Sequence, residues 1–431
     1  MLSKNISIGP QGNLIFAGHN TVELAKKYGT PLYLMDETMI RERMRTYKTA
    51  MAEFFPDGSV PEYASKAFSC KRIYEIANEE GINVDVVSPG EMYTAYKAGF
   101  PMERVFFHGN NKTDSDIEFA VNLGIGCFVV DSIDEIIAIN SICAQKGIKQ
   151  KIMMRVTPGI DPHTHKKIST GSVESKFGIA IETGDAMSIV KKCLKFDNVS
   201  LHGFHCHIGS QIFESEPFVT AAEIMVSFMA EVRDITGFTA NTLNLGGGFG
   251  VKYTEKDPDI DYRERIREVA DKMLEICNTK NFPMPKVLME PGRSLVADAG
   301  MTLYTVGGVK EIKGYRNYVS IDGGMADNPR YALYESEYTV YNATNAADEP
   351  DYIATIAGRC CESGDLIQED VKIKKPVRGD ILAVATTGAY NYSMASNYNR
   401  IARPPVVMLT EDSDYLAVKR ESLDDLISLD I

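Results

Sequence analysis

Several features that would assign the chain to other classes of protein are missing from its sequence. No apolar run is long enough to span a bilayer, and residues 1–10 contain no apolar core of a secretory signal. The eight cysteines are scattered and include no C-x-x-C pair, which argues against a disulfide framework and predicts mostly buried free thiols in a reducing compartment. We therefore expect a cytoplasmic protein.

Positive charge is also scarce. Lys and Arg number 46 against 59 Asp and Glu, so the formal net charge is -13. An acidic surface repels nucleic acids and anionic membranes, and we expect neither as a partner. A small zwitterionic substrate remains compatible, because a local basic pocket can lie within an acidic protein. The hydrophobic fraction of 44% is typical of a globular enzyme.

Short β-rich runs alternate with amphipathic helical stretches between residues 60 and 290. Repeated strand–helix units require parallel pairing through right-handed crossovers. Eight such units favour a closed, TIM-like (β/α)8 barrel over an open doubly wound sheet. The predicted strands are 60–64, 83–87, 105–107, 127–131, 151–156, 201–207, 242–245 and 286–290.

The pattern changes near residue 295. Helical periodicity fades, and runs rich in Val, Thr and Tyr between turn residues predict an antiparallel β domain, a sandwich or barrel, over residues 295–431. Strand-like segments within residues 1–30 could join this domain, because chain ends often lie close together. The barrel is then expected over residues 31–294.

The loops that follow the strands form the functional face of a parallel barrel. One lysine, Lys66, follows the first predicted strand. Alone, it would be read as an ordinary solvated lysine, but a desolvated lysine can lose its proton and attack a carbonyl. Other chemically active residues fall at the same face: Asp85, His108, Arg155, His207, Ser210, Gly248, Glu290, Gly292 and Arg293.

Each of these motifs also has a plain structural explanation. Gly246-Gly-Gly-Phe-Gly could be a flexible turn or a backbone nest for phosphate. It is not a G-x-G-x-x-G fingerprint, because Val251 takes the last glycine position, and a dinucleotide site is disfavoured. His205, Cys206 and His207 fit no standard zinc spacing, and strand alternation sends the cysteine to the opposite face, so we expect no metal.

Three further motifs lie in the second domain. Cys361-Glu362 could be an ordinary turn, or a proton donor beside an ammonium-binding carboxylate. Arg330 and Tyr334 could lie on a rim or clamp a carboxylate. Tyr390, in an aromatic-rich stretch, could simply pack at a sheet edge.

Together and in this order, the motifs resemble the alanine-racemase-like class of pyridoxal-phosphate enzymes, and within it the decarboxylases that act on diaminopimelate. The resemblance covers nearly the whole chain and its ordered combination is highly specific. The matching motifs are Tyr63-Ala-Ser-Lys66, His108-Gly-Asn-Asn-Lys112, His205-Cys-His-Ile-Gly-Ser210-Gln, Gly246-Gly-Gly248-Phe-Gly, Glu290-Pro-Gly-Arg293, Cys361-Glu-Ser-Gly-Asp365 and Gly388-Ala-Tyr390.

The resemblance implies a pyridoxal 5'-phosphate cofactor bound to Lys66 as a Schiff base, with Asp85 and Arg155 among the other cofactor-binding residues. It also implies the remaining roles: Glu290 at the pyridine nitrogen, His207 stacked on the ring, Ser210, Gly248, Gly292 and Arg293 at the phosphate, Arg293, Arg330 and Tyr334 at the distal end of the substrate, Glu362 at its distal ammonium, and Tyr390 at both cofactor and substrate. Members are homodimers with shared active sites, so Cys361 and Glu362 are expected to serve the other copy.

The expected reaction is decarboxylation of meso-2,6-diaminopimelate to L-lysine and CO2, the last step of lysine biosynthesis, with Cys361 or Lys66 returning the proton. Decarboxylases of ornithine, arginine or carboxynorspermidine, a racemase, and a non-catalytic decarboxylase-like regulator are the alternatives. Glu362 favours diaminopimelate, because the related decarboxylases of basic amino acids tend to carry Asp at this position, and Arg330 suits a substrate with a second carboxylate. Tyr331 stands where the family commonly has Pro. This departure weakens the match of Arg330 to the family's arginine.

Overall fold

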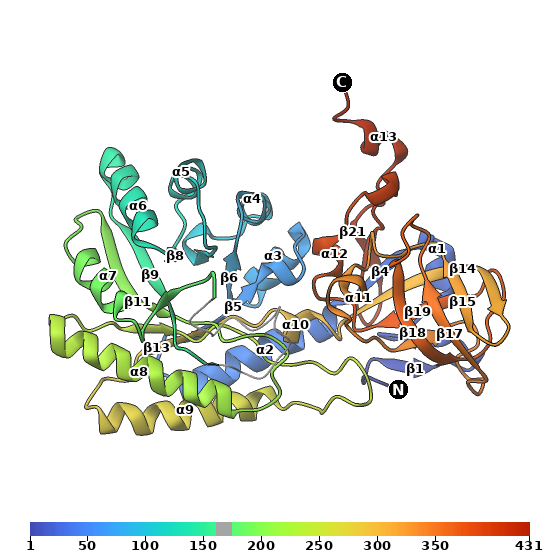
Figure 1. Ribbon diagram of the computed structural model, residues 1–431, viewed down its shortest axis with the longest axis horizontal. Coiled ribbons are helices and arrows are strands. Elements are labelled where there is room, and N and C mark those ends of the chain that lie inside the picture. The colour runs from blue at the N-terminus through green and yellow to red at the C-terminus, as the bar shows by residue number, and fades with distance from the viewer. Residues whose placement is uncertain (161–174) are drawn as a thin grey trace. The chain divides into compact units, whose positions relative to one another are not determined.

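The computed structural model describes residues 1–160 and 175–431, and these form two compact units (Figure 1). The barrel unit consists of residues 43–250 and 260–292, and the β unit consists of residues 1–42, 251–259 and 293–431. The unit boundary thus falls after residue 42 rather than after residue 30, because the strand β4 (Leu32–Asp36) pairs with two strands of the β unit. No helix of the described residues is long and apolar enough to cross a membrane.

The barrel unit contains the expected closed ring of eight parallel strands. Their order is β5-β6-β7-β8-β9-β11-β12-β13, and β13 pairs again with β5. All eight lie within two residues of their predicted limits: β5 Val60–Ala64, β6 Asn83–Val86, β7 Val105–Phe107, β8 Cys127–Val130, β9 Gln150–Thr157, β11 Val199–His205, β12 Thr242–Asn244 and β13 Lys286–Met289. The short β10, Ile179–Ala180, pairs with β9 outside the ring.

Helices surround these strands in Figure 1. They follow the strands in sequence as α3 Lys71–Glu79, α4 Pro89–Lys97, α5 Asp114–Leu123, α6 Ile133–Lys146, α7 Asp185–Cys193, α8 Glu216–Thr236 and α9 Tyr262–Thr279. Local capping starts several of them: Ser88 accepts the Glu91 N–H at the start of α4, and Thr113 forms a capping box with Asp116 at the start of α5. The helix α2, Glu37–Phe54, precedes the first barrel strand.

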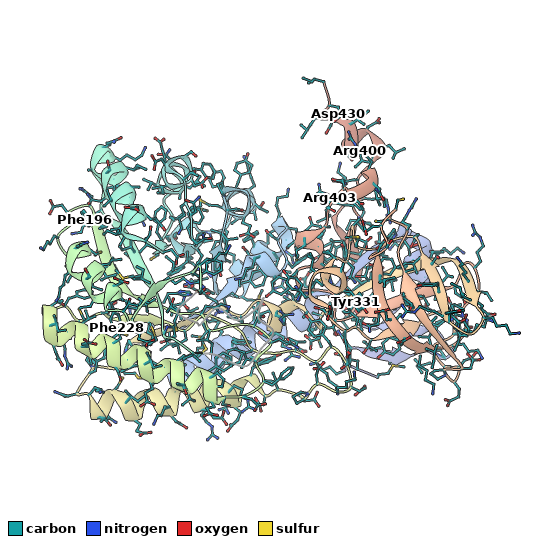
Figure 2. All side chains as sticks on the ribbon, in the orientation of Figure 1. Phe196, Phe228, Tyr331, Arg400, Arg403 and Asp430 are labelled. Atoms are coloured by element: carbon teal, nitrogen blue, oxygen red, sulfur yellow. The ribbon has the colours of Figure 1, made fainter. Side chains whose placement is uncertain are left out.

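Apolar faces of the helices pack on the outer face of the strands. Phe228 on α8, labelled in Figure 2, is 3% exposed and meets Phe204 of β11 edge to face, with ring centroids 5.1 Å apart. On the opposite side of the same helix, Glu223 and Asp234 are exposed, and Ile235 in its last turn is 49% exposed. The helix is therefore amphipathic, with its apolar side buried against the sheet.

The β unit is built on one large, mostly antiparallel sheet. Its order is β18-β17-β15-β14-β4-β20-β21, with β19 between β14 and β16, and two of its pairings, β15–β17 and β20–β4, are parallel. The strands are β14 Gly300–Ile312, β15 Arg316–Ile321, β16 Val340–Asn342, β17 Tyr352–Ala357, β18 Leu366–Ile373, β19 Ile381–Ala385, β20 Val406–Leu409 and β21 Asp414–Val418. Short helices interrupt it: α10 Arg293–Val296, α11 Arg330–Tyr334, α12 Asn391–Met394 and α13 Leu423–Ile427.

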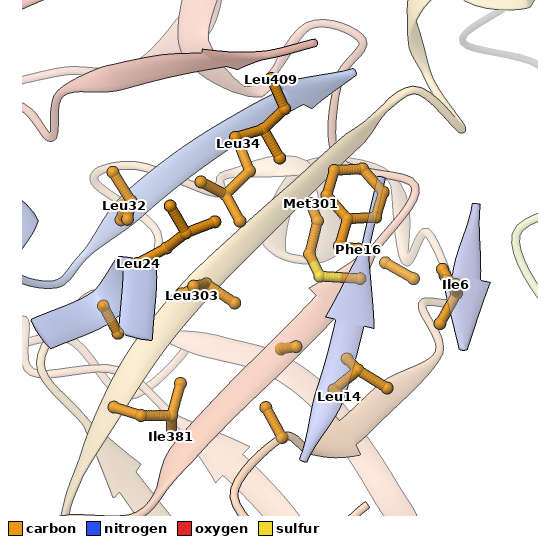
Figure 3. Close-up of a cluster of buried hydrophobic side chains, with 14 of the residues drawn as sticks. Ile6, Leu14, Phe16, Leu24, Leu32, Leu34, Met301, Leu303, Ile381 and Leu409 are labelled. Carbon is orange, nitrogen blue, oxygen red and sulfur yellow. The ribbon is translucent and has the colours of Figure 1, made fainter. Parts of the chain in front are cut away.

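The N-terminal strands join the β unit, as the sequence indicates. The strands β1 (Ile6–Ile8), β2 (Leu14–Phe16) and β3 (His19–Asn20) form a small sheet of their own, followed by α1 (Thr21–Tyr28). Figure 3 shows side chains of these segments packed with residues of β4, β14, β19 and β20 in one buried cluster. Burial of Leu14 and Phe16, both fully inaccessible, attaches the N-terminus to the sheet.

We predict that Phe228→Ala lowers the free energy of unfolding by about 3–5 kcal/mol, because it removes a buried ring and leaves a cavity beside Phe204. Ile235→Ala is the matched control on the same helix, and its exposed position should keep the change within about 0.5 kcal/mol. Urea unfolding followed by circular dichroism measures both. Equal losses for the two variants would contradict this account of how α8 packs.

Candidate active site

The residues predicted for the barrel face lie at the carboxyl end of its strands. Lys66 is the middle residue of the 3-10 turn Ser65–Ala67 that directly follows β5. Its neighbours Ser65 and Ala67 are buried, whereas the Lys66 side chain is exposed. The Cβ that any other residue would carry at Gly292 would lie 3.0 Å from Ala64 Cβ and 3.2 Å from Ala67 Cβ, so this glycine packs directly beneath the lysine turn.

Two glycine-bearing loops lie beside each other at this edge. The loop after β11 and the loop after β12 are joined by the Ile212–Phe249 bridge, in which the Ile212 N–H donates to Gly248 O over 3.0 Å. Gly248 has φ +120°, and a Cβ there would lie 2.5 Å from Gly209 O. Only glycine fits this conformation and approach. Ser210, predicted for the same anion site, lies in the neighbouring loop.

His207 is held by the glycine loop. Its Nδ1 accepts a hydrogen bond from the Gly247 N–H over 3.3 Å, which places the ring proton on Nε2. Burial, followed by the positive charges of Lys66 and Arg155, lowers the pKa of His207 well below its ordinary value. The ring is therefore neutral near pH 7.

Behind the loop, a polar chain enters the barrel interior. Asn244 Oδ1 accepts the Gly246 N–H over 2.8 Å, and Asn244 Nδ2 donates to Glu62 Oε2 over 3.0 Å. Burial, reinforced by the charges of Glu290 and Asp85, raises the pKa of Glu62 well above its ordinary value, which favours the protonated form of this carboxyl. Asn244 thus connects a buried carboxyl inside the barrel to the backbone of the glycine loop. Nothing in the sequence pattern distinguished Glu62 or Asn244.

Glu290, at the end of β13, lies between two histidines. Its Oε1 is 3.0 Å from His205 Nε2 and 3.4 Å from His108 Nε2, and all three residues are at most 7% exposed. Burial opposes the charge of Glu290, but the nearby imidazoles of His205 and His108 outweigh it and hold the pKa of this carboxyl well below its ordinary value. Glu290 and His108 were both predicted at this face from the sequence, whereas no role was predicted for either histidine.

Two further ionisable residues, Asp85 and Arg155, belong to the same edge of the barrel as Glu290. Asp85, at the end of β6, is 1% exposed, and burial together with the charge of Glu290 raises its pKa well above the ordinary value. Arg155, on β9, lies half-buried, with its guanidinium 4.5 Å from the Phe177 ring. Burial lowers the pKa of Arg155. The predicted residues Lys66, Asp85, Arg155, His207 and Glu290 therefore share one face of the barrel unit.

Several buried polar atoms at this face have no hydrogen-bond partner among the described residues. They are Asp85 Oδ1, His108 Nε2, both ring nitrogens of His205, and Glu290 Oε1. Buried polar atoms without partners are costly in a finished structure and mark places where a ligand or ion completes the bonding. The ligand atoms of His108, His205 and Glu290 also lie within 4.8 Å of one another, the spacing of a metal site, although the zinc spacing that we considered involved His207 and not His108.

The predicted residues of the β unit form a second group. Arg293 is 6% exposed and donates to Tyr253 Oη over 2.7 Å, and its guanidinium lies 5.0 Å from the Tyr390 ring. Arg330, also 6% exposed, lies 4.9 Å from the rings of both Tyr390 and Tyr334. Tyr390 is thus placed between two buried arginines.

Tyr390 adopts a backbone conformation that tyrosine rarely takes. Its φ is +68°, in the left-handed region, at the start of α12. Strain of this kind is found where a side chain must be aimed at a functional position. Nearby, a Cβ at Gly388 would lie 1.9 Å from Val296 O, so the chain approaching Tyr390 passes directly over α10.

Cys361 and Glu362 lie in the loop between β17 and β18, and both side chains are exposed. The loop itself is firmly held: Asp365 accepts the N–H groups of Met325 and Cys360, each over 2.6 Å. The Cys361 N–H donates to Asn399 Oδ1 over 2.7 Å. An exposed thiol and carboxylate are therefore presented on a fixed backbone.

Comparison with known proteins agrees with this arrangement. The family described as pyridoxal-dependent decarboxylase, pyridoxal binding domain, matches residues 37–297. Diaminopimelate decarboxylase of Halalkalibacterium halodurans is 48% identical over 98% of this chain and 96% of its own length. The enzyme of that name from Bacillus subtilis is 45% identical over 97% of this chain and 95% of its own.

A solved structure extends the similarity to three dimensions. Diaminopimelate decarboxylase of M. jannaschii in complex with L-lysine matches with a TM-score of 0.91 at 35% identity, covering 99% of this chain and 98% of that one. Such identity over nearly the full length of each protein exceeds what a shared fold alone requires. The chain belongs to the pyridoxal-dependent decarboxylases, and within them to the diaminopimelate decarboxylases.

Proposed function

We propose that the chain is a pyridoxal-phosphate-dependent carboxy-lyase that converts meso-2,6-diaminopimelate to L-lysine and CO2, the last step of lysine biosynthesis. The observation that carries this proposal is the 45–48% identity, over nearly the whole chain, to relatives named diaminopimelate decarboxylase. The candidate cofactor-binding residues Lys66, Asp85, Arg155, His207 and Glu290, at the carboxyl edge of the barrel strands, support it.

The barrel face suits pyridoxal phosphate in two respects. The two glycine loops pack closely, as at Gly248, where any Cβ would collide with Gly209 O, and glycine-rich turns of this kind can present backbone N–H groups to an anion. The unpartnered buried Oδ1 of Asp85 and the second carboxylate oxygen of Glu290, which the two histidines do not approach, can bind polar groups of a ring. We assign Ser210, Gly248, Gly292 and Arg293 to the phosphate, Lys66 to the covalent link, and Glu290, Asp85, Arg155 and His207 to the ring and its surroundings.

Bound pyridoxal phosphate supplies an electron sink for the charge that is left on carbon when CO2 departs. Lys66 would hold the group covalently through Nζ. Glu290 would keep its negative charge near the ring nitrogen and so favour a proton on that nitrogen. His207, neutral because of burial, can contact the ring without adding a competing positive charge.

Substrate selection falls to the second group of residues. Arg293, Arg330 and Tyr334 bind the carboxylate that is retained, since a guanidinium pairs with a carboxylate through two parallel hydrogen bonds. Glu362 binds the distal ammonium, and Tyr390 contacts both cofactor and substrate. When the carbon–carboxylate bond breaks, the electron pair remains on carbon, and Cys361 or Lys66 delivers the proton that completes L-lysine.

We further propose that two copies share their active sites, with Cys361 and Glu362 of each copy serving the other. Both side chains are exposed on a firmly held loop, which leaves them accessible to a second copy. A cytoplasmic location fits the thiols: in the described chain all eight cysteines are free and six are buried.

Decarboxylation should be specific for the proposed substrate. We expect the purified protein loaded with pyridoxal phosphate to release CO2 from meso-2,6-diaminopimelate with formation of an equal amount of L-lysine. Ornithine, arginine and carboxynorspermidine tested in parallel should yield little. Release of CO2 from ornithine alone, or from none of these compounds, would reject the proposed function.

Lys66→Ala should remove the covalent link to the cofactor. Borohydride reduction of the loaded wild-type protein, followed by peptide mass spectrometry, should place the cofactor on the peptide that contains Lys66, and the variant should carry no such adduct. Lys71→Ala, an exposed lysine at the start of α3, is the matched control and should be modified like wild type. A reduced adduct on a different lysine would overturn the assignment.

Shared sites predict complementation between two inactive variants. Lys66→Ala and Glu362→Gln should each be inactive alone, and mixing them under conditions that exchange subunits should restore part of the activity, because one site per mixed pair then contains both native residues. Differently tagged copies purified in tandem isolate the mixed species. A mixed species without activity, or a protein that remains monomeric, would contradict sharing.

A further inference from the structure

The two histidines at Glu290 have no part in the function described so far. His205 Nε2 and His108 Nε2 approach the same oxygen, Oε1, at 3.0 and 3.4 Å, and the two rings meet edge to face with centroids 5.0 Å apart. His205 is wholly buried and His108 is 4% exposed. One oxygen of the carboxylate is therefore enclosed by two imidazole edges.

We propose that His108 and His205 are positioning residues that fix the Glu290 carboxylate and stabilise its negative charge for the ring nitrogen of the bound cofactor. The proposal rests on the function proposed above. By occupying Oε1, the two imidazoles restrict the rotation of the carboxylate and leave the second oxygen for the ring. A carboxylate with one defined orientation needs no reorganisation when the charge of the ring changes during the reaction.

Both histidines can serve as neutral N–H donors. Burial lowers the pKa of His108 well below its ordinary value and also lowers that of His205, although the charge of Glu290 opposes both shifts. The positive charges of Arg155, which faces both rings, and of Lys112, which faces His108, act in the same direction as burial, whereas Asp131 opposes it at His205. The contacts do not have hydrogen-bond alignment, and such bonds commonly tighten when the ligand binds.

The backbone around each histidine is fixed by interactions that do not involve Glu290. Lys112, buried in the loop that follows His108, donates to Gly109 O over 3.0 Å, Val129 O over 2.8 Å and Glu135 Oε1 over 2.7 Å. His205 is the last residue of β11, paired in register with Arg155 of β9 and Asn244 of β12. The imidazoles are thus anchored from two separate elements and can orient the carboxylate between them.

The experiment compares methionine and glutamine at each histidine. Methionine fills the space without a donor, whereas the glutamine Nε2 can take the place of the histidine Nε2. We expect His205→Met and His108→Met each to weaken pyridoxal phosphate binding about tenfold, the loss expected for a hydrogen bond to a charged group, and the glutamine variants to stay within about threefold of wild type. Affinity is measured by fluorescence titration of the cofactor-free protein.

Two further readouts separate positioning from general structural damage. The absorbance spectrum of the bound cofactor and its pH dependence should shift in the methionine variants toward those of Glu290→Gln. In a Glu290→Gln background, His205→Met should cause little additional loss, because the interaction that it removes is already gone. His202→Met is the matched control on the same strand, remote from the carboxyl edge, and should bind the cofactor like wild type.

The outcomes are distinct. Methionine variants with wild-type affinity and spectrum, or losses that add fully to that of Glu290→Gln, would overturn the positioning role. A stoichiometric metal ion in the purified protein would also overturn it, because a metal would then occupy the three ligand atoms. Failure of the wild-type protein itself to bind pyridoxal phosphate would reject the proposed function as well.

Discussion

A negative charge held inside the barrel mouth is the constraint on which the rest of the site depends. Glu290 is buried, and burial alone would neutralise its carboxylate. The chain keeps it charged by bringing imidazole nitrogens from β11 and from the loop after β7 to the same oxygen. Closing the ring of eight strands is what makes this possible, because the ends of β7, β11 and β13 are then brought to one edge.

The glycine loop is held from inside the barrel by a buried carboxyl, Glu62, through Asn244. The Asn244 Nδ2 donates to Glu62, and its Oδ1 accepts the backbone N–H of Gly246. The next residue, Gly247, donates to His207 and sets its tautomer. A hydrogen-bonded chain therefore runs from the barrel interior to the histidine at the mouth, and each member fixes the next.

The sequence predicted the elements that local pattern controls. Alternation, turn residues and helix caps are local, and the strand limits in the barrel follow from them, as at Val60–Ala64 and Val105–Phe107. Residues 32–36 were included in the predicted barrel range, and no strand was predicted there. The pairing of β4 with β14 and β20 joins segments hundreds of residues apart, which local pattern does not reveal. A continuous apolar run does not reveal its partners.

The difference between local and long-range pattern also explains which site residues could be predicted from the sequence. Lys66 and Glu290 carry strong local motifs, whereas the meeting of His108 with His205 depends on closure of the whole ring. His205 did have a detectable signal, because it stands two residues before His207 at the end of a predicted strand. Glu62 had no detectable signal in the sequence. A single acidic residue in an apolar strand can point into the barrel or out of it, and the sequence does not show which side of the strand faces inward.

Two carboxyl groups at one mouth cannot both be charged at low cost, and the structure separates their roles. The imidazole neighbours of Glu290 lower its pKa and favour its ionised form. At Asp85, burial and the negative charge of Glu290 raise the pKa, and the positive charges of Lys66 and Arg155 only partly offset this rise. The pKa values of the two carboxyls are therefore moved in opposite directions, so Glu290 keeps its negative charge to lower pH than Asp85 does. Glu290 is thus the better suited of the two carboxyls to pair with a protonated ring nitrogen.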